Sequence, residues 1–450
     1  MLRLTPSRGA ALLALGAALA CASLPASAHA EARTSDIVLG KTAAAREIDI
    51  SELPELQARH GLVMGADGTV YFEREADAPI KIASVTKIMT ALVALENSEL
   101  DEIVVTDHAA ANVGESVVGL EEGDALTMEE ALTGLMVMSG NDTAMAIAAH
   151  VGENIDPKTS DPLKTFVEAM NERAAELGCK NTVFSNPHGL DFGAWTGDLH
   201  STTREIMQIY AECMKNEQFR SLDNSDRTQM HVTSANGSPR TIDLLVRNKI
   251  RGQEGNIGGK TGSTYDAGDC FVSAFSRETG GEIYVAVFGA DNDTVRFEDT
   301  LELANWHYGH LAALPFANTP SKRGDTPILA EATCTDWSDK TAAVTVADGA
   351  TSDPVFTLAG DIEQKIDLKD LDGAVDRGAD AGTISYLQNG EVVGEARLVT
   401  AESVAGTSPF EWVMVRFDRM LRFFQGMPGT AASIVLNEAP DPLAFDAWNA

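Results

Sequence analysis

Ser84 and Lys87 stand at a spacing that could support nucleophilic chemistry. A serine hydroxyl is a weak nucleophile at neutral pH and needs an adjacent base. Side chains three residues apart on a helix share a face, and apolar residues at helical spacing run from Val85 onward. Lys87 could therefore reach the Ser84 oxygen, and a desolvated lysine has a lowered pKa and can accept a proton. By itself, the pair favours a plainer interpretation, a helix cap followed by an exposed lysine.

Ser139 and Asn141 form a second candidate pair, at a break between two apolar helices. The hydroxyl could relay a proton to a leaving amine, and the amide could hold a substrate carbonyl and the base lysine. The alternative is an ordinary helix stop and N-cap. Ser234 and Asn236 have the same spacing but are typical of a surface turn.

Lys260, Thr261 and Gly262 form the third cluster, directly before a pair of predicted strands. On an edge strand, the lysine and threonine could offer a charge and a hydroxyl to a carboxylate, and the glycine would let a substrate backbone lie close. A glycine turn leading into a sheet is equally consistent with this triplet alone. The three clusters in this order, however, resemble the signature of penicillin-binding proteins and class A β-lactamases, which indicates a serine acyltransferase.

Strand and helix patterns on both sides of these clusters predict the elements that would position them. Residues 61–64 and 69–72 read as a β-hairpin, and 270–275 and 283–288 read as another strand pair. Helical periodicity starts at residue 83, and a capping box at Thr127 and Glu130 opens a second helix. Residues 160–250 read as mixed helix and loop. We expect one α/β unit whose sheet is completed by the two ends of residues 31–318.

The remainder of the chain reads as a small β-rich domain over residues 328–405, followed by an amphipathic helix over 410–425 and a tail over 426–450. Apolar residues of the helix fall on one face, and Arg416, Arg419 and Arg422 lie off it. Such a helix can lie in a bilayer interface or pack on its own protein.

The first thirty residues predict export. Residues 1–30 have a positive start, a short apolar run and a small-x-small ending, which is typical of a cleaved signal peptide rather than a membrane span. The net charge of −33 argues against a nucleic-acid partner. The cysteines of the mature chain could be buried thiols or disulfides: Cys179, Cys213, Cys270 and Cys334.

Beyond the triplets, the chain resembles the low-molecular-mass penicillin-binding proteins, the D,D-carboxypeptidases typified by penicillin-binding protein 5. The flanking residues carry this likeness: 83–93, 138–142, 186–190, 200–204, 259–263 and, in the β-rich part, 382–390. The resemblance implies that Ser84 is acylated and that Lys87 is its general base. It also implies substrate contacts, with an oxyanion site between the N–H groups of Ser84 and Ser263 and a terminal carboxylate supported by Arg296. A lone surface arginine is the alternative for Arg296.

The family implies a penicillin-binding, β-lactamase-like domain with an antiparallel sheet and an all-α subdomain, then a β-rich domain. It implies a carboxypeptidase that removes the terminal D-alanine of peptidoglycan stem peptides, is inhibited covalently by β-lactams and needs no metal or organic cofactor. The alternatives are a D,D-endopeptidase, transpeptidase or β-lactamase on the same scaffold, or a degenerate wall-binding module. We expect a periplasmic protein, peripheral on the outer face of the cytoplasmic membrane if residues 410–425 anchor it.

Overall fold

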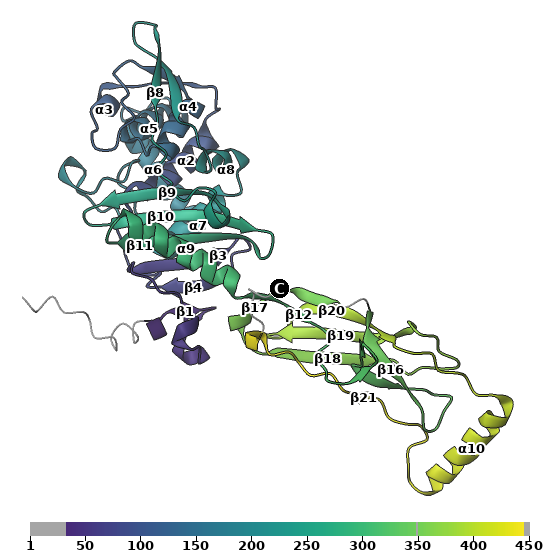
Figure 1. Ribbon diagram of the computed structural model, residues 1–450. Coiled ribbons are helices and arrows are strands. Elements are labelled where there is room, and N and C mark those ends of the chain that lie inside the picture. The colour runs from purple at the N-terminus through teal and green to yellow at the C-terminus, as the bar shows by residue number, and fades with distance from the viewer. Residues whose placement is uncertain (1–32, 348–349, 445–450) are drawn as a thin grey trace, which may run out of the picture.

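The computed structural model describes residues 33–347 and 350–444; the predicted signal peptide lies outside them. The chain forms an elongated molecule with an α/β part at one end and a β-rich part at the other (Figure 1). The predicted division into domains at residues 31–318 and 328–405 stays a prediction.

A seven-stranded antiparallel sheet organises the α/β part, in the order β2-β1-β4-β3-β11-β10-β9. The early hairpin pairs with the late strands, with Val63 opposite Val285, which confirms that the two ends of this part complete one sheet. β9, which carries Lys260, is an edge strand. The strands are β1 (Ile37–Val38), β2 (Lys41–Thr42), β3 (His60–Gly65), β4 (Val70–Arg74), β9 (Asn256–Thr264), β10 (Gly268–Arg277) and β11 (Gly281–Ala290).

Helices cover both faces of this sheet because its strands alternate two apolar sets of side chains. Phe271 and Phe275 of β10 pack in one core with Leu303 of the C-terminal helix α9 (Asp293–Gly309). Val272 and Ala274 face the larger helical core on the other side. That core is formed by α2 (Lys87–Asn97), α4 (Met128–Val137), α5 (Asn141–Ile155), α6 (Pro162–Glu176), α7 (Thr203–Cys213) and α8 (Glu217–Asp223), with the short α3 (His108–Ala111) beside α5.

The predicted helix start at Thr127 is correct, but the capping box is only half formed. The Thr127 hydroxyl accepts from the backbone N–H of Glu130, whereas the Glu130 carboxylate accepts from Arg227 and from the N–H of His231. The stretch 160–250, expected as helix and loop, also contains a hairpin that joins a four-stranded sheet. Its strands are β5 (Ile103–Val105), β6 (Ala125–Thr127), β7 (Gln229–Thr233) and β8 (Pro239–Asp243). Ser234 lies in the turn of that hairpin, as predicted.

The β-rich part contains a six-stranded sheet in the order β18-β19-β20-β16-β15-β21. Tyr386 is fully buried, and its hydroxyl donates to Pro315 O at 2.9 Å. The strands of this part are β12 (Leu311–Pro315), β13 (Lys322–Arg323), β14 (Thr326–Pro327), β15 (Ala330–Thr333), β16 (Thr341–Val346), β17 (Thr351–Phe356), β18 (Ile362–Leu368), β19 (Asp380–Gln388), β20 (Glu391–Thr400) and β21 (Ile434–Val435).

The chain leaves the β-rich sheet for α10 (Pro409–Phe424) and then returns to it. α10 begins with a capping box between Ser408 and Glu411 and lies at the tip farthest from the α/β part (Figure 1). Beyond it, Ile434 and Val435 pair with β15, and Asn437 donates to Phe316 O. The C-terminal tail therefore supplies the last strand of this sheet.

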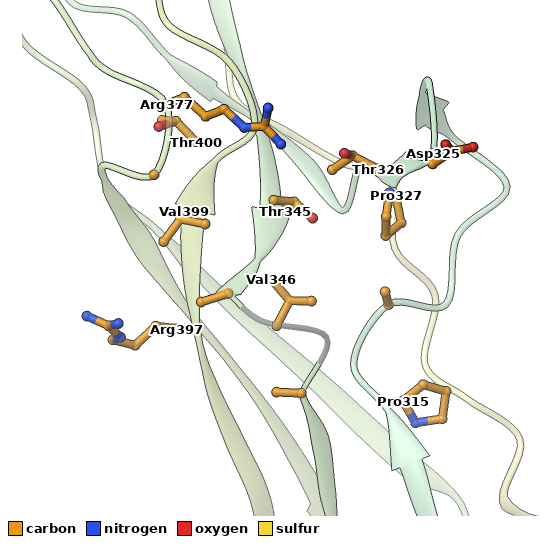
Figure 2. A pocket seen from close by; sticks show the side chains of 14 residues that line it. Pro315, Asp325, Thr326, Pro327, Thr345, Val346, Arg377, Arg397, Val399 and Thr400 are labelled. Carbon is orange, nitrogen blue, oxygen red and sulfur yellow. The ribbon is translucent and has the colours of Figure 1, made fainter. Parts of the chain in front are cut away.

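A hollow of about 540 Å³ lies on the β-rich part, between the ends of β16 and β20 and the β14 segment. Figure 2 shows Arg377 and Thr345 beside it, with Pro327 across from them. None of the predicted site residues lines this hollow.

Candidate active site

Ser84 lies in a tight turn that leads into α2. Residues Ala83–Thr86 form a 3-10 turn directly before α2, and Ala83 has a left-handed φ of 46°. The chain around Gly189 is pressed against this turn, because a Cβ at Gly189 would lie 1.8 Å from Ala83 O. Ser84 itself is half-buried, so its hydroxyl is held by packed backbone and remains reachable.

Lys87 is fully buried, which overturns the plainer interpretation of an exposed lysine. Its Nζ lies 2.9 Å from Ser84 Oγ, 2.8 Å from Asn141 Oδ1 and 2.9 Å from His188 O. Burial, and then the charge of Lys260, lower the pKa of Lys87 well below its ordinary value, while Asp142 opposes them. The neutral amine is therefore favoured at this position.

The three contacts of Lys87 match the hydrogen-bonding capacity of a neutral amine. The Asn141 Oδ1 and His188 O atoms can only accept, so they take the two N–H donors of the amine. Its lone pair then faces the Ser84 hydroxyl. Asn141 is held in this orientation because its Nδ2 donates to Gly114 O. A neutral lysine so placed can act as a base toward serine.

The backbone carbonyl of His188 is a site group that side-chain reasoning missed. Asn186 holds its loop, accepting from the N–H groups of His188 and Gly189 and donating to Leu190 O. The His188 ring is buried, and burial lowers its pKa to about 3. In the sequence, residues 186–190 were notable only as a short motif shared with the family. That shared motif was the one signal that could have pointed to this loop.

Ser139 and Lys260 form the second half of the site. Lys260 Nζ donates to Ser139 Oγ at 2.8 Å and to Thr261 O at 2.7 Å. Ser139 has a left-handed φ of 64° between α4 and α5. The N-cap of α5 is Gly140, so the N-cap half of the alternative is wrong, whereas the helix stop is correct because α4 ends at Val137. Burial, and then the charge of Arg296, lower the pKa of Lys260 to about 7.

Asp142, next to Asn141, fixes the loop over this side of the site. Its carboxylate accepts from the N–H groups of Val118, Gly119 and Leu120. The N–H of Asn141 donates to Ser116 O in the same loop. These hydrogen bonds hold the Ser139–Asn141 turn against residues 114–120.

Gly262 lies where β9 crosses the start of α2. A Cβ at Gly262 would lie 3.1 Å from Ser84 N, 3.0 Å from Val85 N and 3.0 Å from Ile82 O. The absent side chain therefore lets the strand approach the backbone of the Ser84 turn. Thr261 beside it is buried, and Ser263 is exposed at the end of the edge strand.

Arg296 is buried in the first turn of α9, so the alternative of a surface arginine is wrong. Its guanidinium donates to Gly262 O at 3.0 Å and to Asp269 Oδ1 at 3.1 Å, and it pairs with Asp293. Arg296 thus braces β9 directly behind Gly262.

The structure brings all the predicted site residues to β9 and the adjoining helices. The four cysteines in the described part of the chain are buried and unpaired. Within residues 33–347 and 350–444, no group of three or more His, Cys, Asp or Glu side chains could hold a metal ion.

A serine, a neutral lysine and a lysine-bearing edge strand in this arrangement define a serine acyltransferase of the penicillin-binding fold. The crystal structure of the Streptomyces K15 DD-transpeptidase is similar, with a TM-score of 0.52 and 32% identity, covering 56% of this chain and 97% of that one.

The model of peptidase family S11, D-alanyl-D-alanine carboxypeptidase, matches residues 47–292. The D-alanyl-D-alanine carboxypeptidase DacC of Escherichia coli is 27% identical over 387 residues, which is 81% of this chain and 90% of DacC. DacF of Bacillus subtilis is 27% identical over 362 residues, 77% of this chain and 86% of DacF. The chain belongs to family S11 and is a serine-type D-alanyl-D-alanine carboxypeptidase that acts on peptidoglycan.

Proposed function

We propose that a peptide ending in D-Ala-D-Ala acylates Ser84 with the help of Lys87. The serine oxygen attacks the carbonyl of the penultimate residue while its proton passes to the Lys87 amine. The oxyanion that forms is stabilised by the N–H groups of Ser84 and Ser263. The observation that carries this proposal is the 2.9 Å contact between the Ser84 hydroxyl and Lys87, a buried lysine whose pKa is lowered.

Collapse of the tetrahedral intermediate breaks the C–N bond and releases the last D-Ala. The leaving amine takes its proton from Lys87 through the Ser139 hydroxyl. Asn141 meanwhile holds the substrate carbonyl. Water, deprotonated by Lys87, then attacks the ester carbonyl and regenerates the Ser84 hydroxyl. A β-lactam would acylate the same oxygen.

The substrate's terminal carboxylate is assigned to the β9 side of the site. Lys260 contacts the Ser139 hydroxyl, Thr261 follows it on β9, and Arg296 of α9 binds the carbonyl of Gly262 behind the strand. The acidic surface of the protein, with a net charge of −33, repels anions, so a buried group of cations provides the attraction that an anionic peptide needs.

Product analysis tests this function. The purified full chain is incubated with a pentapeptide ending in D-Ala-D-Ala, and the products are separated by mass. Release of one D-Ala supports carboxypeptidase action through Ser84. Joined peptides would favour transpeptidation, the activity for which the Streptomyces K15 enzyme is named. Cleavage of cross-linked dimers instead would favour the activity of the Pseudomonas aeruginosa D-alanyl-D-alanine endopeptidase, a relative 28% identical over 259 residues.

We propose, in addition, that the protein is exported and that α10 holds it at the outer surface of the cytoplasmic membrane. No described helix is long and apolar enough to cross a bilayer. α10 buries Val415 against the β-rich core but exposes about half or more of Phe410, Val413 and Phe417, as well as Phe424. A helix with an uncovered apolar face at the tip of the molecule is suited to the bilayer interface.

The arginines of α10 are less available to headgroups than their spacing suggests. Arg419 donates to the carbonyls of Thr335 and Trp337 in the protein's own β-rich part. Arg422 pairs with Asp418 on the helix. Arg416 lies over the ring of Trp412 and, unlike the other two, has no acidic or carbonyl partner among the described residues. Membrane attachment therefore depends mainly on apolar burial.

A further inference from the structure

Tyr210 and Asp223 form a buried pair behind β9, outside the groups that contact Ser84. Tyr210 of α7 is fully buried, and its hydroxyl donates to Asp223 Oδ2 at 2.6 Å. Asp223, the last residue of α8, is only 6% exposed, and its Oδ1 has no hydrogen-bond partner among the described residues. Burial raises the pKa of Asp223 to about 7, so its carboxylate is charged on the alkaline side of neutrality. There, a buried anion with a single neutral donor is costly and calls for a compensating charge nearby.

The edge strand is shaped to meet this carboxylate. A Cβ at Gly258 would lie 2.4 Å from Asp223 Oδ2, and Gly258 has a φ of 149°. Any side chain there would force β9 away from α8. Lys260 lies two residues further along the strand, and the negative charge of Asp223 raises its pKa.

Lys260 is the cation that acts most on the Asp223 carboxylate, and Arg220 acts on it less. Arg220, on α8 with Asp223, is engaged by the Glu282 carboxylate, and Tyr284 and Cys213 face the Tyr210 side. Around Lys260, the cations Arg296 and Arg247 favour its neutral form, and Lys87 close by is itself favoured as a neutral amine. The direct contacts of Lys260 are an uncharged hydroxyl and a carbonyl. The charge of Asp223 opposes burial and the two arginines and raises the pKa of Lys260.

We propose that Asp223, oriented by Tyr210, is a positioning residue that keeps Lys260 protonated and so sets the alkaline limit of substrate carboxylate binding. The inference rests on the proposed role of Lys260 in binding that carboxylate. Without the negative charge of Asp223, Lys260 would lose its proton at a lower pH, since burial and its cationic neighbours already favour the neutral amine.

The test is the pH dependence of kcat/KM for a D-Ala-D-Ala peptide in three variants of the full chain. Asp223→Asn keeps the shape of the side chain and removes its charge. We expect the alkaline limb to move about one pH unit lower, the size expected for one charge acting across several ångströms of protein. Tyr210→Phe should move it in the same direction by less. Asp226→Asn, which removes an exposed carboxylate just beyond α8, should leave the limb in place.

Two outcomes would overturn the inference, and a separate variant tests its basis. If Asp223→Asn lowers kcat/KM equally at every pH, or leaves the profile unchanged, Asp223 is only a structural residue. Lys260→Arg, which does not titrate in this range, should abolish the alkaline limb. If that variant retains the limb, the proposed role of Lys260 fails. If it loses the limb while Asp223→Asn does not shift it, only the role of Asp223 fails.

Discussion

Gly262→Ala should slow acylation of Ser84 without unfolding the protein. The added Cβ would meet backbone atoms on three sides: Ile82 O and Val85 N at 3.0 Å and Ser84 N at 3.1 Å. Backbone cannot rotate away, so β9 and the Ser84 turn must separate by a few tenths of an ångström. A displacement of 1 Å at a reacting centre can cost about 100-fold in rate, so a loss of about tenfold is expected here. Overpacking of this kind destabilises by about 1–3 kcal/mol.

The measurement is the second-order rate constant for acylation by a labelled penicillin, with Tm recorded for each variant. Gly309→Ala is the matched control, since its Cβ has no atom within 4 Å and alanine is the better helix former. It should acylate at the native rate. If Gly262→Ala also acylates at the native rate while remaining folded, the close approach of β9 to Ser84 does not govern the chemistry.

Four further outcomes are expected. Ser84→Ala should abolish both peptide turnover and penicillin labelling, and labelling that persists would end the assignment of the nucleophile. Lys87→Ala should slow acylation by about 10²–10⁴-fold. In the native protein the acylation rate should rise with pH as Lys87 loses its proton, because the neutral amine is the base. A rate that falls over that range would contradict this. Arg296→Ala should lower kcat/KM by about ten- to hundredfold with a drop in Tm, since Asp269 loses its partner; an unchanged kcat/KM at matched stability would remove Arg296 from substrate binding. Phe417→Glu should release the full chain from anionic vesicles while cleavage of a soluble peptide continues, and retained sedimentation would count against α10 as the anchor.

A substitution is preferable to truncation for testing α10, for a reason that the sequence did not reveal. The tail reads as an extension past the helix, but residues 434–435 pair with β15 and Asn437 binds across to Phe316 and Gln364. Cutting the chain after Ala405 would remove these contacts together with the helix. Short strands such as β21 have too few residues for periodicity to distinguish them from loop.

The part of the site that depends on local spacing was predictable. Ser84 and Lys87 are three residues apart on one turn, and the predicted strand pair places Lys260 beside a sheet edge. Groups brought in by tertiary packing were not predictable. The carbonyl of His188 has no side-chain identity to detect, and Tyr210 and Asp223 meet only because α7 and α8 fold behind β9. The Thr127 capping box failed for a similar reason: Arg227, a hundred residues later, takes the Glu130 carboxylate.

The basic groups of the site lower one another's pKa values in sequence, and this links binding of the substrate carboxylate to the base strength of Lys87. The charge of Arg296 lowers the pKa of Lys260, and the charge of Lys260 lowers the pKa of Lys87. A substrate carboxylate bound on the β9 side, as we propose, would stabilise the protonated form of Lys260. Lys260 would then remain charged and continue to favour the neutral form of Lys87. An anionic peptide would thus add to the effect of burial, which is the larger cause of the lowered pKa of Lys87.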